Sequence, residues 1–354
     1  MIRVYGTKIG SGSWARVTHG VLSGLQESES LAGFFEIGRV DDFSPSRASG
    51  DSSGYDASVG VAVGPHTVSS LMKGFGNHNS RLMVVATNSS WLPRFYPELT
   101  EVTAYAATSS WAAEVVAAHV PSFPVLIWRH GVDAAFCPPD LVREPGDELK
   151  VLHLASTHLE RKGTTELIHG WCRAVRDGPL RGELHLLVDG PRGFFDRAIH
   201  QASKGDPVLV ETIKMVTRKG LGVQDMASYL GGFDLVCQPS RAEGFGLVPL
   251  EARACGVPVA ATLCTGHADH MAASDAGVVP IRHGDLAPVN DGPGAMAPSV
   301  APDDIAEALC SAFSSRERLK EESINAAHGV RYNWSWESVT RDFLRRHANE
   351  ISLV

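Results

Sequence analysis

Short apolar runs alternate with amphipathic helical patterns along most of this 354-residue chain. Such alternation is typical of α/β units built around a parallel sheet. We predict two sets of these units, separated by a proline-rich and acidic stretch. The first set has strands at residues 2–6, 33–37, 57–63, 81–87 and 125–128, and the second has strands at residues 150–155, 183–188, 208–213, 235–238 and 257–262.

The stretch between the two sets, residues 137–148, contains three prolines and four acids, a composition that indicates a linker. The simplest architecture is therefore an α/β chain of two Rossmann-like domains, residues 1–140 and residues 149–333, with a cleft between them. Residues 284–302 are rich in glycine and proline, and we expect a long loop there.

Charge and hydropathy exclude some classes of function. The net charge of −8 argues against a generally basic surface for nucleic acid or anionic lipid. The N-terminus lacks the layout of a signal peptide, and no apolar run approaches the length of a membrane span. We therefore expect a cytoplasmic protein without integral membrane association.

Two glutamates, Glu243 and Glu251, flank a glycine-bearing turn in the stretch Pro-Ser-Arg-Ala-Glu-Gly-Phe-Gly-Leu-Val-Pro-Leu-Glu-Ala, residues 239–252. The apolar run before the turn predicts a buried strand, and the apolar spacing after Leu247 predicts a helix. Glu243 then lies at the carboxyl edge of the sheet, where open α/β folds bind ligands, and Glu251 lies inside the helix. Taken alone, two glutamates are more often solvated surface residues than site residues.

Together with Ala-Cys-Gly-Val-Pro-Val at residues 254–259, this ordered stretch resembles the E-x7-E region of retaining GT-B glycosyltransferases, especially glycosyltransferase family 4. The resemblance implies a GT-B fold with a deep interdomain cleft, in which residues 149–333 bind a nucleotide sugar and residues 1–140 recognise the acceptor. It also implies that a helix at about residues 336–354 packs back on the first domain. We expect no metal and no cofactor, because lysine and helix dipoles usually stand in for a metal in this fold class.

The donor-side candidates follow from the chemistry of a departing diphosphate, which needs positive charge placed in advance. Arg161 and Lys162 follow the strand at residues 150–155 and match the Arg-Lys-Gly of the family, whose lysine contacts the diphosphate. Glu243 is expected near the donor sugar, and Glu251 on the ribose hydroxyls. We assign catalysis to Glu243, Lys162 and Arg161, and donor binding to Gly12, Phe245, Gly246, Leu247, Glu251 and Arg218.

The acceptor side departs from the family pattern. Many relatives carry a histidine after the fourth strand of the first domain, where this chain has Asn88 and Ser89. An amide or hydroxyl still bonds a sugar hydroxyl but does not carry a proton near pH 7. His66 is a possible substitute, although a lone histidine there is more often structural, and Trp91 opens an aromatic loop that stacks on sugars or nucleobases.

These residues predict an enzyme, a retaining glycosyltransferase that moves a hexose from a nucleotide-diphosphate sugar to a hydroxyl acceptor. UDP-glucose is the favoured donor, before GDP-mannose and UDP-N-acetylglucosamine, and the favoured acceptor is a small molecule or sugar. Two alternatives stay open: a phage-type DNA glycosyltransferase acting on a hydroxymethylated base, and a non-catalytic sugar-nucleotide binding protein. The sequence leaves the oligomeric state undetermined.

Overall fold

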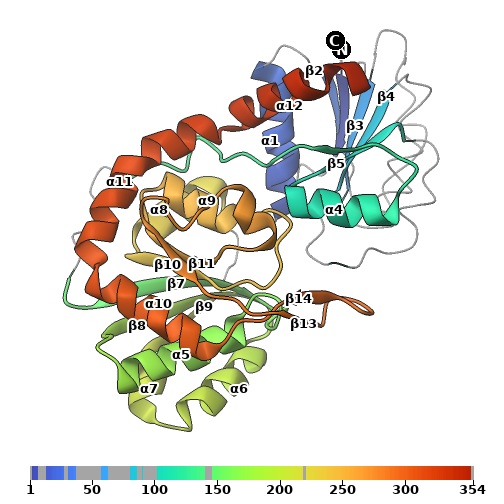
Figure 1. Cartoon of the computed structure of the whole chain (residues 1–354). Coiled ribbons are helices and arrows are strands. Elements are labelled where there is room, and N and C mark those ends of the chain that lie inside the picture. The colour runs from blue at the N-terminus through green and yellow to red at the C-terminus, as the bar shows by residue number, and fades with distance from the viewer. Residues whose placement is uncertain are drawn as a thin grey trace. The chain divides into compact units, whose positions relative to one another are not determined.

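The computed structural model divides the chain into two compact α/β units (Figure 1). The first unit comprises Met1–Asp133 and Tyr332–Val354, and the second comprises Ala134–Arg331. The structure describes residues 2–6, 13–27, 31–36, 57–62, 80–85, 90, 102–139, 146–217 and 221–351. The boundary falls at Asp133 and not at residue 140, because the prolines of the expected linker already pack in the second unit. Pro139, for example, lies 3.3 Å from the position of a β-carbon on Gly231.

A six-stranded parallel sheet with the order β2-β1-β3-β4-β5-β6 forms the centre of the first unit. Its elements are β1 (Ile2–Gly6), α1 (Ser13–Glu27), β2 (Leu31–Glu36), β3 (Ala57–Ala62), β4 (Ser80–Val85), β5 (Ala104–Ala107), α4 (Ser110–His119) and β6 (Val125–Ile127). The sequence pattern does not predict β5, because three of its four residues are alanine, which is depleted in strands. All four are buried between β4 and β6, where tertiary packing overrides that preference.

The last helix, α12 (Trp336–Ile351), belongs to the first unit and packs against α1. Two glycines of α1 make this close approach possible. A β-carbon on Gly20 would lie 1.8 Å from the Trp336 ring, and one on Gly24 would lie 2.3 Å from the Thr340 hydroxyl. On the same helix, Phe343 stacks on the buried Trp128 with a centroid distance of 4.3 Å. The C-terminal segment therefore completes the core of the N-terminal unit.

The second unit is built on another six-stranded parallel sheet, with the order β12-β11-β10-β7-β8-β9. Its strands are β7 (Leu149–Ser156), β8 (Gly182–Asp189), β9 (Ile213–Thr217), β10 (Leu235–Gln238), β11 (Val259–Thr262) and β12 (Val278–Ile281). The chain adds β8 and β9 on one side of β7 and then β10, β11 and β12 on the other. The direction of strand addition therefore reverses between β7 and β10, which is where open α/β sheets bind ligands.

The helices of the second unit are α5 (Thr164–Asp177), α6 (Arg192–Ser203), α7 (Pro207–Glu211), α8 (Val223–Gly231), α9 (Leu247–Ala254), α10 (Pro302–Ser314) and α11 (Arg316–Asn333). Helices α5 and α10 pack against each other, and the fully buried Trp171 and Phe195 of α5 and α6 anchor the core. Among the described residues, no helix is long and apolar enough to cross a membrane.

The strand expected at residues 208–213 is wrong. Residues 207–211 form the short helix α7, and strand β9 starts only at Ile213. The helix begins because the Asp206 carboxylate accepts a hydrogen bond from the Val208 amide at 2.9 Å, with Pro207 at the first helical position. Asp as N-cap followed by Pro is a helix-start signal that outweighs the apolar run after it.

The loop expected at residues 284–302 is also wrong in part. Strands β13 (Leu286–Pro288) and β14 (Met296–Pro298) pair antiparallel and form a hairpin. Its far end is closed by backbone hydrogen bonds, including Ala295 N–H to the Gly292 carbonyl at 3.1 Å. Short strands with proline at their ends carry a weak periodic signal, which is why the sequence pattern misses them.

Candidate functional site

Two loops meet at the point where the second sheet reverses its direction. The first, residues 157–163 between β7 and α5, is called the cation loop; the second, residues 239–246 between β10 and α9, is called the glutamate loop. The Arg241 amide donates to the Arg161 carbonyl at 2.8 Å. Gly163 has a φ of 63°, and a β-carbon there would lie 2.2 Å from the Pro239 carbonyl oxygen. Glycine is therefore required where the two loops cross.

Three predicted catalytic side chains come together across these loops. The Lys162 ammonium makes a short ion pair with the Glu243 carboxylate, and Arg161 Nη1 lies 3.6 Å from Glu243 Oε2. Arg161 also donates to the Ala242 carbonyl at 2.9 Å. The Arg161 and Glu243 side chains are 6% and 10% exposed, whereas Lys162 is 20% exposed. The cluster is thus a largely desolvated group of two cations around one carboxylate.

These cations determine the protonation of Glu243. Burial raises the pKa of this carboxyl, but the charges of Lys162 and Arg161 outweigh burial and lower the pKa to about 2. A carboxylate with that pKa stays ionised at neutral pH, so it does not deliver a proton. Glu243 is suited instead to accepting hydrogen bonds or to stabilising positive charge.

A buried histidine, His267, packs against the turn that leads into α9. Gly246 is the N-cap of α9 with a φ of 89° and no side-chain cap, so the first N–H groups of the helix are not capped by a side chain. A β-carbon on Gly246 would lie 2.1 Å from Cδ2 of His267. His267 Nδ1–H donates to the Thr262 carbonyl at 2.9 Å, and burial lowers the pKa of the ring. The sequence pattern gives no sign of this contact, because His267 lies in a separate segment, the short 3-10 helix η2 (Thr265–Asp269).

The remaining donor-side candidates lie at the same end of the second unit. Phe245 is buried, and its carbonyl accepts a hydrogen bond from His270 Nε2–H at 3.0 Å. Leu247 is the first residue of α9, and Glu251 lies in the second turn of that helix with only 3% of its surface exposed. Phe245 thus belongs to the glutamate loop, and Leu247 and Glu251 follow it in α9. Their contacts with a donor stay predictions.

A second buried histidine, His153 on β7, lies beneath the two loops. Its Nδ1–H donates to the Cys237 carbonyl of β10 at 2.9 Å, which leaves Nε2 to accept from the Thr164 hydroxyl of α5 at 2.9 Å. The tautomer is assigned from these partners. Burial lowers the pKa of His153 to about 4, so the ring is neutral and ties together the three elements that carry the loops.

We expect the chain to lose stability as the pH falls from 6.5 towards 4. Burial lowers the pKa of His153 to about 4 and that of His270 to about 3, whereas an unfolded histidine titrates near 6.5. Below pH 6.5 the unfolded state therefore binds more protons, and each unit of pKa depression corresponds to about 1.4 kcal/mol. Thermal unfolding between pH 7.5 and 4.5 measures this slope. It should flatten in His153→Gln and persist in His283→Gln, whose side chain is exposed; equal slopes would contradict the assignment.

Arg241, which was not among the predicted site residues, fixes the hairpin β13–β14 to the glutamate loop. Its guanidinium is 7% exposed and donates to the Glu160 carboxylate of the cation loop at 2.9 Å. Its other bonds, at 2.9–3.3 Å, go to four backbone carbonyls of the hairpin, those of Ala287, Pro288, Ala297 and Pro298. A single side chain therefore connects both loops and both hairpin strands.

The far end of the hairpin reaches the cation loop. Asp291 Oδ2 lies 3.7 Å from Arg161 Nε, and its Oδ1 lies 3.6 Å from Nδ1 of His158. Burial raises the pKa of Asp291, against the opposing effect of Arg161. The Asn290 amide donates to the Glu160 carboxylate at 3.1 Å. Asp291 was not among the predicted site residues, because 130 residues separate Asn290 from Glu160.

The other predicted site residues lie outside the described parts of the chain. These are the donor-side candidates Gly12 and Arg218 and the acceptor-side candidates His66, Asn88, Ser89 and Trp91. Their assignments stay predictions.

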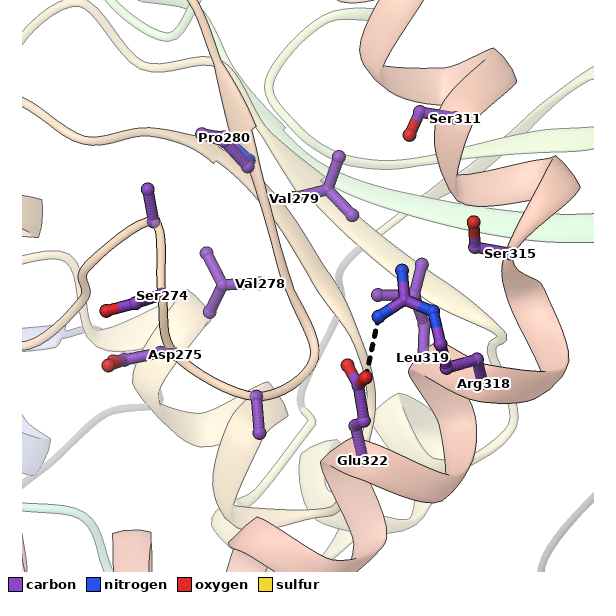
Figure 2. Close-up of a pocket in the computed structure, with 12 residues that line it drawn as sticks. Ser274, Asp275, Val278, Val279, Pro280, Ser311, Ser315, Arg318, Leu319 and Glu322 are labelled. Atoms are coloured by element: carbon purple, nitrogen blue, oxygen red, sulfur yellow. Dashed lines mark hydrogen bonds and ion pairs between the residues drawn. The ribbon is translucent and has the colours of Figure 1, made fainter.

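A cavity of about 470 Å³ elsewhere in the second unit contains none of the predicted site residues (Figure 2). It is lined by residues of β12, α10 and α11 and by the loop before β12. Its charged side chains are already paired: Arg318 donates to Glu322 at 2.6 Å, and Asp275 accepts from Arg253 at 2.8 Å. This cavity therefore lacks the uncompensated positive charge that an anionic ligand requires.

Residues 148–314, which include both loops and the hairpin, match the family described as Glycosyl transferases group 1. A relative, the MMP alpha-(1->4)-mannosyltransferase of Mycolicibacterium hassiacum, is 26% identical over 227 residues. The matched region is 63% of this chain and 48% of that relative, so the match spans about half the relative's length.

Two solved structures share the fold over nearly the whole chain. A glycosyltransferase from Rickettsia africae has a TM-score of 0.69 at 14% identity, with 99% of this chain and 98% of that chain covered. Anabaena HepE, solved in complex with UDP and glucose, has a TM-score of 0.66 at 13% identity, with 98% and 99% covered. These likenesses confirm the predicted α/β fold of the GT-B class. Residues 148–314 are therefore similar to the glycosyl transferases group 1 family, and the chain has a GT-B fold.

Proposed function

We propose that this protein is a retaining glycosyltransferase that moves a hexose from a nucleotide-diphosphate sugar to a hydroxyl acceptor. The observation that carries the proposal is the Lys162–Glu243–Arg161 cluster at the sheet reversal of a domain similar to glycosyl transferases group 1. The buried Arg161 and the half-buried Lys162 lie just before α5 and suit the negative charge of a diphosphate. The ionised Glu243 carboxylate next to them suits a sugar on which positive charge develops.

In the proposed reaction the bond between the anomeric carbon and the diphosphate oxygen breaks while the acceptor oxygen bonds to the same face of that carbon. The departing phosphate takes the proton of the acceptor hydroxyl, so no protein base is needed. Lys162 and Arg161 compensate the negative charge that develops on the leaving group. Glu243, ionised at neutral pH, stabilises the sugar, and Glu251 accepts hydrogen bonds from the ribose hydroxyls.

UDP-glucose is the donor that we propose first. The similar structure of Anabaena HepE contains UDP and glucose, which supports this choice, whereas the relative from Mycolicibacterium hassiacum is named a mannosyltransferase. A panel of donors therefore has to include GDP-mannose and UDP-N-acetylglucosamine. For the acceptor we propose a small molecule or sugar that carries a free hydroxyl.

The test is incubation of the protein with each donor, with and without candidate acceptors, while release of nucleoside diphosphate is followed by chromatography. We expect one donor to release its nucleoside diphosphate and the acceptor to gain the mass of the sugar. NMR should show that the new linkage has the same anomeric configuration as the donor. Binding of UDP without release from any donor would identify a sugar-nucleotide binding protein instead. A product of opposite anomeric configuration would contradict retention.

A further inference from the structure

The hairpin β13–β14 brings a carboxylate onto the cations that the proposed function assigns to the donor diphosphate. Asp291 lies within 4 Å of two groups of the cation loop, Arg161 and His158. Its side chain is 15% exposed, and that of Arg161 is 6% exposed, so water screens this pair weakly. The hairpin β13–β14 that carries Asp291 extends from the second unit in Figure 1.

Hydrogen bonds that anchor the hairpin to the two loops fix the position of Asp291. Arg241 donates to carbonyls of both hairpin strands, and the Asn290 amide donates to the Glu160 carboxylate next to Arg161. Both anchors connect the hairpin with the two loops of the candidate site. Because Asn290 directly precedes Asp291, the position of the carboxylate follows from backbone contacts.

Arg161 is at the same time not fully satisfied by its present partners. Its Nε lies 3.7 Å from Asp291, an ion-pair distance that is too long for a hydrogen bond, and Nε has no hydrogen-bond partner within the described part of the chain. A buried guanidinium N–H without a partner is costly, and it marks a place where a bound anion would gain a hydrogen bond. The cation loop is therefore neutralised by Asp291 but left with hydrogen-bonding capacity for another anion.

We propose that Asp291 is an internal counter-anion that competes with the donor diphosphate for Arg161 and His158 and so sets the affinity for nucleoside diphosphates. The inference rests on the proposed function, because it assumes that the diphosphate binds at the cation loop. Asp291 balances the charge of Arg161, which would otherwise be buried beside only one carboxylate, that of Glu243. When a diphosphate binds, its oxygens take over this role, and repulsion from Asp291 weakens binding and favours release of the diphosphate product.

The test compares Asp291→Asn with Asp285→Asn, which makes the same charge change at an exposed position directly before β13. Calorimetry measures Kd for UDP, for inorganic pyrophosphate and for uridine. We expect Asp291→Asn to lower Kd for UDP and pyrophosphate about tenfold, the effect of one nearby charge, and to leave uridine unchanged. Asp291→Ala should tighten binding similarly, because charge rather than shape is the cause. Asp285→Asn should match the wild type.

Unchanged or weaker UDP binding in Asp291→Asn, while the donor assay gives normal turnover, would overturn this inference alone. Equal tightening in Asp285→Asn would also overturn it, since the effect would then reflect net charge. If neither UDP nor pyrophosphate binds to the wild type or to the Asp291 variants, the inference and the proposed donor site both fail. A cooperative thermal unfolding transition shows that the variants fold.

Discussion

Replacing Lys162 with alanine should lower kcat/KM for the donor reaction by about two orders of magnitude or more. Preorganised charge at a developing anion contributes on this scale in a site shielded from water, and Lys162 is the more accessible of the two cations in the cluster. The effect should appear mainly in kcat, because the charge on the leaving group is greatest in the transition state. Release of nucleoside diphosphate under single-turnover conditions measures it.

The matched control is Lys214→Ala, which removes a lysine from β9 that is 44% exposed and pairs with Glu183. We expect wild-type turnover in this variant. Lys162→Arg keeps the charge but changes the donor geometry, so it should recover part of the rate. An unchanged rate in Lys162→Ala would remove this residue from the mechanism and leave compensation of the diphosphate to Arg161.

Lys162→Ala also tests the coupling within the cluster. Without Lys162, the Glu243 carboxylate keeps only Arg161 as a close cation, at 3.6 Å, and its pKa should rise from about 2 towards its usual range. The activity that remains should therefore fall at a higher pH in the variant than in the wild type when the solution is acidified. A pH profile of kcat/KM distinguishes this result from a loss of folding, which circular dichroism follows separately.

Local sequence signals were sufficient for the strand–turn–helix units that carry the candidate site. The apolar run predicts β10 with its observed bounds, the apolar spacing after Leu247 predicts α9, and glycine marks the turn between them. Lys162 and Glu243 were predicted as site residues, but their contact was not; it arises because β7 and β10 are neighbours and their carboxyl ends meet at one edge of the sheet.

The parts that the sequence did not predict depend on contacts between distant segments. Arg241 bonds the Pro298 carbonyl 57 positions away, and no local pattern specifies that pairing. Likewise, the sequence shows His153 only as a polar residue within an apolar strand. Its two hydrogen-bond partners come from β10 and α5, which are distant in sequence or belong to another element. The alanine-rich β5 is a strand only because β4 and β6 flank it. In each case tertiary packing supplies the free energy that local propensity does not.

Replacing Arg241 with alanine should have the largest effect on stability, about 3 kcal/mol of the free energy of unfolding, because buried carbonyls of the hairpin lose a hydrogen-bond donor. The variant removes the hydrogen bonds of Arg241 to four hairpin carbonyls and to the Glu160 carboxylate, which keeps the Asn290 amide as a donor. Urea unfolding measures the loss. The control is Arg282→Ala, which removes an arginine that is 68% exposed and paired with Asp304 and Glu307, and should cost at most about 1 kcal/mol.

The same variant separates the support of the hairpin from the chemistry of the cation loop. If Arg241 fixes the hairpin, limited proteolysis of Arg241→Ala should cleave within residues 284–302 faster than in the wild type or in Arg282→Ala. Arg241→Lys keeps a charge for Glu160 but lacks the planar fork that reaches both strands, so it should fall between the two. Equal unfolding free energies for Arg241→Ala and Arg282→Ala would mean that the hairpin is held by its own strand pairing, and Asp291 would then reach the cation loop without help from Arg241.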